Sequence, residues 1–511
     1  MAGPGDAPPG VGTAGPATGR PTELPSAELP PATGEERRIT LAEALRLGAA
    51  RNLELLSGAY DPLIADRAID AADGVFDTLL TADFAGGRRE SVSNFSFNGT
   101  DVTQEDFYGA GVGVSRALRN GGRLSAVFRA DRLRSNSAVV ERNPSWTSEL
   151  SVEYAQPLLR GAGDVAMADV RRAQSASRAA DHAFDALTDN VLLQIEAAYW
   201  ELAFAHAQLA ARRKSESVAA NLLAETQTRF DARVATVLDL ADARAGLESR
   251  RGDRLFVEGA LRKADDVLRA LILPFDGSPG AGPRLVPTDD PVAVPPSDRL
   301  DPRDVERYVA QAVRGRPDLL AARAALDARD VDVDVARNDL LPQLDLVARL
   351  AVDGLDRHLG SSLEETFSGQ ATTGTLGLNF SMYLGRRTAQ AKLCIAQWSR
   401  SQAALRVREQ ENRVVVEVRA ALHDLATAQA RRVTAGGEIA AAREALDGEA
   451  RKERSGESTP YRVLEKEDTL TQAVTRENRA SMDVRIATAR LWKAIGMLRE
   501  ARGIPRPATA E

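Results

Sequence analysis

Four segments of the chain alternate between apolar and polar residues, which is the pattern of a β-strand with two unlike faces. They lie at residues 123–131, 149–154, 344–353 and 376–382. With their flanking residues, the strands are expected to run about 9 to 11 residues, the length that a tilted membrane strand requires. Alternation alone is equally typical of a soluble sheet with one face in a core, so both interpretations stay open at this point.

Two longer stretches, residues 163–230 and 387–454, contain no proline and no turn cluster, and they read as helices. In the first, an apolar stripe at helical spacing comprises Val191, Ile195, Tyr199, Leu202 and Leu209. At 1.5 Å per residue, either stretch forms a helix on the order of 100 Å long. A short break follows each one, at residues 233–236 and 456–460, and a second helical segment comes next. The pattern predicts two long helical hairpins, each preceded by strands.

Segments of the first half recur in the second half in the same order, which indicates an internal duplication. Two pairs precede the hairpins: AARNLEL (49–55) with AVRGRPDLL (312–320), and FDTL (76–79) with LPQL (341–344). Three more pairs, which keep a nearly constant offset along the chain, are LSVEYAQPLLRG (150–161) with LGLNFSMYLGRR (376–387), RVATVLDLADARAGL (233–247) with GESTPYRVLEKEDTL (456–470), and VLRALI (267–272) with ARLWKAI (489–495).

The duplication and two proline-rich stretches divide the chain. Order is expected to begin at Thr40, a predicted helix N-cap with Glu43 as its capping-box partner. The first repeat holds an extra hairpin that turns at residues 120–122, so the number of strands per chain stays open. The expected segments are a disordered Pro/Gly/Ala-rich leader (1–37), a first repeat of helix, membrane strands and helical hairpin (38–273), a proline-rich linker (274–302), a second such repeat (303–498), and a tail (499–511).

The composition excludes several kinds of partner, metal site and membrane segment. The formal charge of −7 gives no reason to expect a nucleic-acid partner. The one cysteine, Cys394, allows no multi-cysteine metal site, and no two of the four histidines stand at metal-ligand spacing. No stretch approaches the ~20 apolar residues of a membrane-spanning helix, which excludes a helical membrane protein. We expect no cofactor and no enzyme, and we expect Cys394 and Trp200 to pack among helices.

Six motifs follow one another between Ile39 and about Gly496. They are ITLAEALRLGAARNLEL, AQPLLRGAG, VATVLDLADARA, RPDLLAARAALDARDVDVDVARNDLLPQLDL, LGLNFSMYLGRR and SGESTPYRVLEKEDTL. In this order and with this duplication, the chain resembles the TolC-like outer-membrane efflux proteins. The resemblance implies an α+β membrane protein built from two internal repeats, in which a trimeric outer-membrane β-barrel continues into a long periplasmic α-helical barrel of coiled-coil hairpins.

The same resemblance implies a function. It is that of a passive exit duct of a tripartite efflux or type I secretion system, located in the cell outer membrane with a periplasmic extension, although no signal peptide is visible in the sequence. The implied partners are a homotrimer of this chain, a periplasmic adaptor (membrane-fusion) protein that opens the duct, an inner-membrane pump that energises it, and outer-membrane lipid. Independently, a few strands cannot close a barrel, and lipid tolerates no open edge, so oligomerisation is required. The alternative is a periplasmic coiled-coil adaptor or scaffold protein of an export system.

The resemblance also implies roles for single residues. The tunnel entrance, or gate, falls on Asp239, Arg462 and Glu465. Arg462 departs from an acidic pattern, and we expect it to pair with Asp239 in place of the usual basic partner, whose position is Ser458 here. The hairpin-tip residues expected to contact the adaptor are Arg233, Val234, Gly456, Thr459, Val463 and Leu464. The strand-to-helix junction falls on Gln156, Pro157, Leu158 and Gly161. The residues expected to face lipid are Leu124, Phe128, Val152, Leu346, Leu350 and Phe380, and those expected to line or border a watery lumen are Arg123, Arg129, Glu149, Glu153, Asp345, Arg349 and Asn379.

Overall fold

The computed structural model describes residues 36–92, 99–273, 283–291, 298, 300–455 and 457–506. The chain divides into two compact units, each assembled from separate parts of the sequence. Helices α4 (Ala168–Asp231) and α9 (Arg387–Arg454) have residues in both. Unit 1 comprises the described residues of Met1–Tyr60, Leu187–Tyr308 and Val418–Glu511, and unit 2 comprises those of Asp61–Ala186 and Val309–Glu417.

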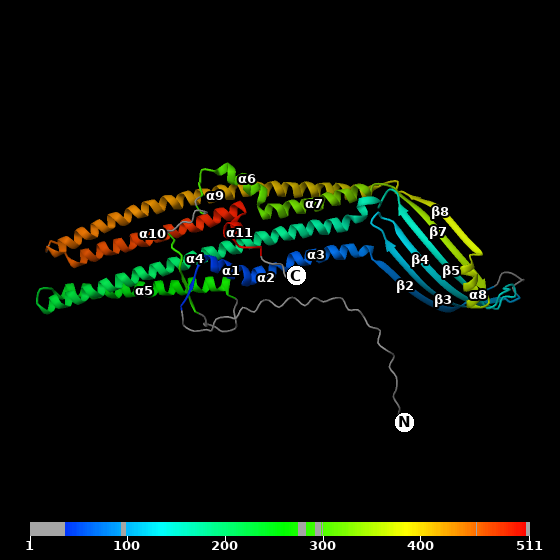
Figure 1. The fold of residues 1–511 in the computed structure, drawn as a ribbon, viewed down its shortest axis with the longest axis horizontal. Helices are drawn as coiled ribbons and strands as arrows, with labels where there is room; N and C mark the ends of the chain where they lie inside the picture. Colours follow the sequence, from blue (N-terminus) through cyan, green and yellow to red (C-terminus); the bar gives the residue numbers. More distant parts are fainter. Residues whose placement is uncertain are drawn as a thin grey trace, which may run out of the picture. The chain divides into compact units, whose positions relative to one another are not determined.

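Unit 2 is built on a six-stranded antiparallel sheet with the strand order β2-β3-β4-β5-β7-β8 (Figure 1). All four predicted strands are present, and the predicted turn at residues 120–122 is confirmed by Gly121, whose φ of 89° is left-handed. The sequence pattern did not single out β2. The strands are β2 (Thr78–Val92), β3 (Val102–Ala117), β4 (Arg123–Ser135), β5 (Ser145–Pro157), β7 (Gln343–Asp356) and β8 (Ala371–Ser381).

The strand register separates the sheet into two faces. Directly opposed residues of an antiparallel pair share a face, and Val152 lies opposite Leu350, as Leu346 does opposite Leu378. The predicted division of the strand residues between two faces is confirmed. The apolar face carries Leu80, Phe84, Val112, Val114, Leu124, Phe128, Leu150, Val152, Leu346, Leu350, Leu376, Leu378 and Phe380, and the polar face carries Asp83, Arg123, Arg129, Asp131, Glu149, Glu153, Asp345, Arg349, Asp353, Thr375 and Asn379.

A short helix that the sequence analysis did not predict, α8 (Leu359–Ser368), joins β7 to β8 and packs on the sheet. Ser148 lies on the same face as Leu150, and its hydroxyl is 2.7 Å from that of Ser362. A Cβ at Gly354 would come within 2.0 Å of the Ser362 carbonyl oxygen. Glycine is therefore required at position 354 for the helix to approach the strands so closely.

The helices of unit 2 lie beside the starts of the two long helices. Helix α3 (Tyr60–Asp73) leads into β2 through a 3-10 turn (Gly74–Phe76), and α7 (Pro317–Asn338) leads into β7. The Ser177 hydroxyl of α4 donates a hydrogen bond to Asp66 of α3 at 2.5 Å. Arg172 of α4 pairs with Asp332 of α7 at 2.7 Å. The second of these contacts joins helices of the two repeats within one unit.

Unit 1 contains the remaining helices and a small parallel sheet in which β1 (Glu36–Ile39) pairs with β6 (Arg284–Pro287). Residues 1–35 of the predicted leader lie outside the described residues, as do residues 274–282, 292–297 and 299 of the predicted linker. Strand β6 nevertheless gives part of that linker a defined structure. The helices are α1 (Leu41–Arg51), α2 (Leu53–Gly58), α5 (Val237–Ile272), α6 (Val305–Gly315, which continues into unit 2), α10 (Pro460–Ile495) and α11 (Leu498–Ala501).

The core of unit 1 contains the aromatic pair Tyr199 and Trp200, which are both fully buried, and the prediction for Trp200 is confirmed. The Tyr199 hydroxyl donates a hydrogen bond to the Ile39 carbonyl of β1 at 3.2 Å. Thr40 is the N-cap of α1, as predicted, and accepts a hydrogen bond from the Glu43 N–H at 3.2 Å. The predicted return bond from Glu43 is replaced by an ion pair with Arg37 at 2.8 Å.

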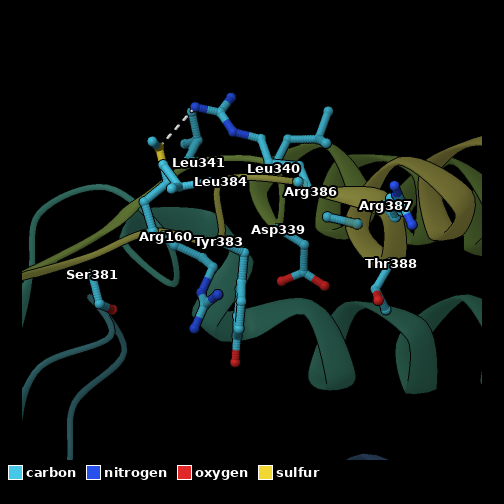
Figure 2. Close-up of a pocket in the computed structure, with 13 residues that line it drawn as sticks. Arg160, Asp339, Leu340, Leu341, Ser381, Tyr383, Leu384, Arg386, Arg387 and Thr388 are labelled. Atoms are coloured by element: carbon cyan, nitrogen blue, oxygen red, sulfur yellow. Dashed lines mark hydrogen bonds between the residues drawn. The ribbon is translucent and has the colours of Figure 1, made fainter.

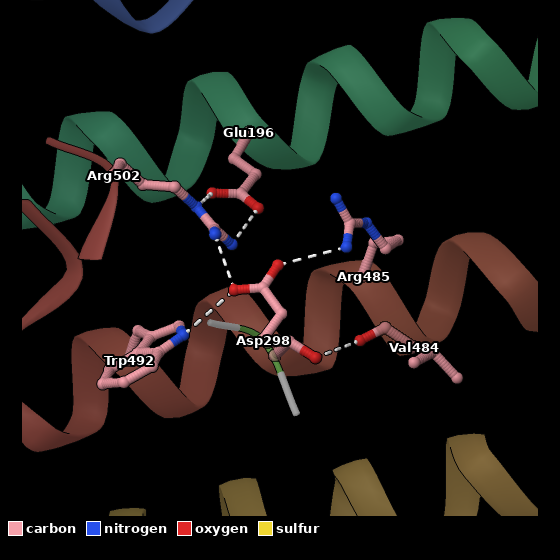
Figure 3. Close-up of polar contacts among 7 residues, drawn as sticks. Glu196, Asp298, Val484, Arg485, Trp492 and Arg502 are labelled. Carbon is pink, nitrogen blue, oxygen red and sulfur yellow. Dashed lines mark hydrogen bonds and ion pairs between the residues drawn. The ribbon is translucent and has the colours of Figure 1, made fainter. Parts of the chain in front are cut away.

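A buried charge network joins three parts of unit 1 (Figure 3). Arg502, in the predicted tail, donates to both oxygens of Glu196 on α4 at 2.7 and 2.9 Å. It also donates to Asp298 at 2.7 Å, and Arg485 of α10 donates to the other oxygen of Asp298 at 3.1 Å. No side chain of this network is more than 9% exposed. Burial raises the pKa of Glu196, and its two bonds to Arg502 act in the opposite direction.

Arg502→Ala should lower the stability of unit 1 strongly. It would leave Glu196 buried without its ion-pair partner, and breaking a buried pair in this way costs about 3–5 kcal/mol. Arg413→Ala is the matched control, because Arg413 pairs with Glu409 one turn away on an exposed part of α9 and such pairs contribute roughly 0.3–0.5 kcal/mol. Thermal unfolding followed by circular dichroism in detergent would compare them. Equal unfolding temperatures for the two variants would contradict the role given to Arg502.

The first long helix ends in a Schellman motif, in which the residue after the helix takes a left-handed conformation. Arg233 has φ 57°, its N–H donates to the Phe230 carbonyl at 2.9 Å, and the Val234 N–H donates to the Arg229 carbonyl at 2.8 Å. At the end of α9, the Glu457 N–H donates to the Lys452 carbonyl at 2.9 Å. This bond is the counterpart of the one made by Val234, because Val234 and Glu457 occupy matching places in the two repeats.

Arg233→Gly should stabilise the first hairpin tip. A side chain in the left-handed conformation costs roughly 1–2 kcal/mol, which glycine avoids, although glycine also loses more chain entropy on folding. We therefore expect slower hydrogen exchange at residues 229–236 by mass spectrometry. Ala232→Gly is the control, since Ala232 has no left-handed φ and only the entropy loss applies. Faster exchange in Arg233→Gly than in the parent chain would refute this account of the tip.

Candidate functional site

The two edges of the sheet are the first candidate surface. In the part of the chain that the structure describes, β2 has β3 as its single strand neighbour and β8 has β7. Every residue of β8 is exposed, and its apolar face presents Leu376, Leu378 and Phe380. At the other edge Phe84 is 76% exposed. Each edge therefore combines open backbone groups with large exposed apolar side chains.

The helix stretches next to these edges are apolar and exposed as well. On α9, just after β8, Trp398 is 72% exposed, and Ile395 and Leu405 are exposed at helical spacing from it. On α3, just before β2, Ile64 is 65% exposed. Cys394 is also exposed, so its predicted place in the core is wrong, because this part of α9 leaves apolar side chains open to solvent within the described chain.

The polar face of the sheet carries a network of charges. Arg129 of β4 pairs with Asp83 of β2 at 2.8 Å and approaches Asp131 to 3.5 Å. The intervening strand β3 makes room for them, because a Cβ at Gly111 would lie 2.5 Å from Asp83 and one at Gly109 would lie even closer to Asp131. Arg349 of β7 also forms an ion pair, with Glu149 of the neighbouring strand β5. Such hydrogen-bonded charges suit a face in contact with water.

Acidic residues outnumber arginines on the polar face. Three of the arginines form ion pairs with these acids, which neutralises part of the acidic charge. The acids are Asp83, Glu105, Asp131, Glu149, Glu153, Asp345 and Asp353, and the arginines are Arg89, Arg123, Arg129 and Arg349.

The first strand-to-helix junction, where β5 leads into α4, is held by backbone hydrogen bonds. The predicted junction residues are brought together here. The Leu158 N–H donates to the Leu344 carbonyl at 2.7 Å, and the Gly161 N–H donates to the Asn338 side chain at 2.7 Å. The Gln156 amide donates to the Pro157 carbonyl at 2.9 Å. Gly161 has φ 84°, so glycine suits this turn.

The second junction, where β8 leads into α9, borders a cleft of about 590 Å³. Tyr383 and Leu384 are highly exposed there. Figure 2 shows the side chains of Arg160, Asp339 and Tyr383 pointing to the same side of the junction. Exposed aromatic and arginine side chains together are typical of a membrane–water interface.

At the first hairpin tip, Asp239 is part of a capping box. Its carboxylate accepts from the Thr236 N–H at 2.8 Å and from the Thr236 hydroxyl at 2.7 Å, and Thr236 accepts from the Asp239 N–H in return. These hydrogen bonds lower the pKa of the Asp239 carboxyl. Asp239 therefore secures the start of α5, and no ion pair joins it to Arg462 among the described residues.

At the second tip, Arg462, Val463 and Glu465 lie on the first turns of α10, next to Tyr461. Tyr461 and Glu465 are exposed. Thr459 is the N-cap of α10 but makes no side-chain cap hydrogen bond. Leu464 is buried, 4.0 Å from the Cβ position of Gly246 on α5. It therefore offers no surface within this chain. Gly456 lies outside the described residues.

A hydrogen bond closes the second tip. The Ser458 hydroxyl donates to Glu449 on α9, and this bond lowers the pKa of the Glu449 carboxyl with help from nearby Lys452 and Arg462. Ser458 is thus engaged with α9. In these contacts, neither hairpin tip forms a hydrogen bond with the other tip.

The tips also present exposed apolar residues that the sequence analysis missed. Val234, which it did identify, is joined by Val237 and Leu238 at the first tip, and Tyr461 is exposed at the second. The sequence could have revealed them, because these large apolar residues stand at helix starts where exposed polar residues are expected.

No group of three or more His, Cys, Asp or Glu side chains within the described ranges is arranged to hold a metal ion. None of the helices formed by those residues is both long and apolar enough to cross a membrane.

The model of the family "Outer membrane efflux protein" matches residues 308–497. The chain is 26% identical over 310 residues to the outer membrane efflux protein BepC of Brucella suis biovar 1 (strain 1330), a match that covers 60% of this chain and 64% of BepC. The chain thus spans less than two thirds of that relative.

Solved structures share the fold at low sequence identity. The CmeC outer membrane channel of Campylobacter jejuni is 16% identical with a TM-score of 0.63, over 90% of this chain and 86% of CmeC. The outer membrane protein VceC of Vibrio cholerae is 15% identical with a TM-score of 0.61, over 89% of this chain and 96% of VceC. Together with the family model and BepC, these matches confirm the predicted fold of long helices and a β-sheet, and they confirm the predicted resemblance to the outer membrane efflux proteins.

Proposed function

We propose that three copies of this chain form the outer-membrane exit duct of a tripartite efflux or type I secretion system. The duct is passive and performs no catalysis. A periplasmic adaptor docks at the hairpin tips and opens them, and an inner-membrane pump supplies the energy. The match to the outer membrane efflux protein model supports this interpretation over a periplasmic adaptor or scaffold, since the relatives named above are outer-membrane proteins.

The observation that carries the proposal is the two-faced sheet with open edges. Its apolar face crosses all six strands, and its polar face holds hydrogen-bonded charges. Such a sheet suits lipid on one side and water on the other. In lipid the unpaired backbone groups of β2 and β8 must find partners, and a neighbouring copy supplies them. The exposed apolar stretches of α3 and α9 continue that interface.

The gate is proposed at the second tip. If three chains meet at one axis, three Glu465 carboxylates repel one another and attract cations, and Arg462 offsets that charge. Asp239 contributes indirectly, because its carboxylate is already engaged with Thr236. The proposed adaptor surface comprises Arg233, Val234, Thr459 and Val463, extended by Val237, Leu238 and Tyr461. It omits the buried Leu464.

The purified chain should migrate as a heat-modifiable trimer and conduct ions in planar lipid bilayers. A deletion strain should become sensitive to exported compounds and recover with the full gene. A monomer that stays in solution without detergent would contradict the proposed duct and favour a periplasmic adaptor or scaffold.

Leu376→Arg and Thr375→Arg form a matched pair for this test, because these neighbours on β8 lie on opposite faces and are both exposed. Arginine on the lipid face costs roughly 2–4 kcal/mol at the bilayer midplane. We expect Leu376→Arg to reduce the amount of trimer in the outer membrane severalfold, and Thr375→Arg to leave it nearly unchanged. Equal losses would show that the faces are misassigned.

Arg462→Ala should increase cation conductance through the closed duct and alter efflux. The substitution removes a positive charge near Glu465, and the effect should weaken at high salt because the tip is open to solvent. Arg443→Ala, which removes the same charge from a position about three turns before the end of α9, is the control. If Arg462→Ala left both conductance and efflux unchanged, the gate would not lie here.

A further inference from the structure

The two repeats differ in length at one place. Helices α1 and α6 have the same length and begin at Leu41 and Val305. Helices α5 and α10 also have the same length and begin at Val237 and Pro460. The distance along the chain between matching helices is smaller for the second pair than for the first. The first repeat therefore holds a segment, between its first helix and the last helix of its hairpin, that the second repeat lacks.

That segment lies in the sheet. From the start of β2 to the end of β5 the first repeat runs from Thr78 to Pro157, whereas from the start of β7 to the end of β8 the second runs from Gln343 to Ser381, about half that span. Strand β2 corresponds to β7, since each follows a helix, and β5 corresponds to β8, since each leads into a long helix. The strands β3 and β4 have no counterpart, and we call them the inserted hairpin.

The inserted hairpin is an integral part of the sheet. Strand β2 pairs along its full length with Val102 to Arg116 of β3, and β4 pairs with β5 from Arg123 to Leu133. Its side chains continue both faces: Phe128 lies opposite Leu150 on the apolar face, and Arg129 reaches across β3 to Asp83 on the polar face. The glycines of β3 that accommodate this ion pair would serve no purpose in a flap that hung free of the sheet.

The strand count has a consequence for closure. With six strands in up-and-down order, the edge strands β2 and β8 run in opposite directions. A second copy related by rotation about one axis therefore presents its β2 antiparallel to β8, and the ring closes with the same hydrogen-bond pattern throughout. Strand β8 has no charged residue, so a neighbouring β2 meets no like charge there.

We propose that the inserted hairpin enlarges the membrane barrel, so that three copies close eighteen strands around one lumen. The proposal rests on the trimeric duct proposed above and adds the size of its outer-membrane section. Without the hairpin, four strands per copy would close twelve. Barrel diameter grows roughly linearly with strand number, so the insertion widens the barrel about 1.5-fold, to a size at which porins leave an open aqueous channel. The occupant of each open edge is the next copy of this chain.

Cryo-electron microscopy of the full chain in lipid nanodiscs, together with native mass spectrometry, would test this directly. We expect a trimer with eighteen strands. A variant lacking residues 102–135 should remain a trimer with twelve strands. From the extracellular side, its pore should exclude polyethylene glycols that are small enough to enter the pore of the full chain. A full-length trimer that closes with twelve strands, its β2 paired to β5, would overturn the inference and leave the proposed function intact. A chain that neither inserts nor oligomerises would instead count against the proposed function.

Cysteine pairs keep the test independent of the deletion, which could fail to fold. In a Cys394→Ser background, Leu80→Cys or Phe84→Cys would be combined with Leu376→Cys or Leu378→Cys. Oxidation should yield covalent dimers and trimers on non-reducing gels. Pairing Leu80→Cys with Val152→Cys on β5 is the control, and we expect no bond within the chain, because two strands separate these positions. An intrachain bond there would overturn the inference.

Discussion

The constraint on which this structure depends is that backbone N–H and C=O groups cannot be left unpaired in lipid, where each costs several kcal/mol. A six-stranded sheet with an apolar face satisfies its interior strands but leaves two edges open. Closure by copies of the same chain removes both edges at once. In the proposed trimer, the exposed apolar side chains of α3 and α9 would lie between copies and those of β2 and β8 would face lipid, so they need no separate explanation as surface defects.

Unit 1 meets a different requirement, and its polar groups are arranged accordingly. Its buried network joins a long helix, the segment between the repeats and the C-terminal residues through Glu196, Asp298 and Arg502. Such a network fixes one arrangement, since a shifted helix would leave a buried charge unpaired. At the tips, by contrast, the polar contacts are local: Asp239 caps its own helix and Ser458 bonds to Glu449. Local contacts hold each tip in shape, and in the proposed trimer they would leave it free to move relative to another chain.

The sequence predicted the periodic parts of this fold well. Helix α9 has the predicted bounds, and the strands with strict alternation were found, because burial of one face imposes a period that can be read directly. Strand β2 was missed because glycines and arginines interrupt its apolar positions, and α8 because its packing depends on a contact of Gly354 that only the fold creates. Cys394 was misplaced because an exposed apolar helix face, which a second copy would cover in the proposed trimer, has the same composition as a core. The tip residues came from resemblance, and periodicity could not reveal that Asp239 is engaged in a cap or that Leu464 is buried.

The position of the inserted hairpin follows from what each end of the sheet must satisfy. Within unit 2, four strands continue into helices, β2 from α3, β5 into α4, β7 from α7 and β8 into α9, and the first junction is tied by hydrogen bonds and turns such as those of Leu158 and Gly161. Adding strands at a junction would displace a helix and disturb its ridges and grooves. Adding a hairpin between β2 and β5 displaces none, because β3 and β4 connect only to strands. It also preserves the even strand number that antiparallel closure needs. The helical part of a repeat is thus held to one length by its packing, while the sheet can grow by pairs, and the difference in length between the repeats lies in the one segment where physical constraints permit it.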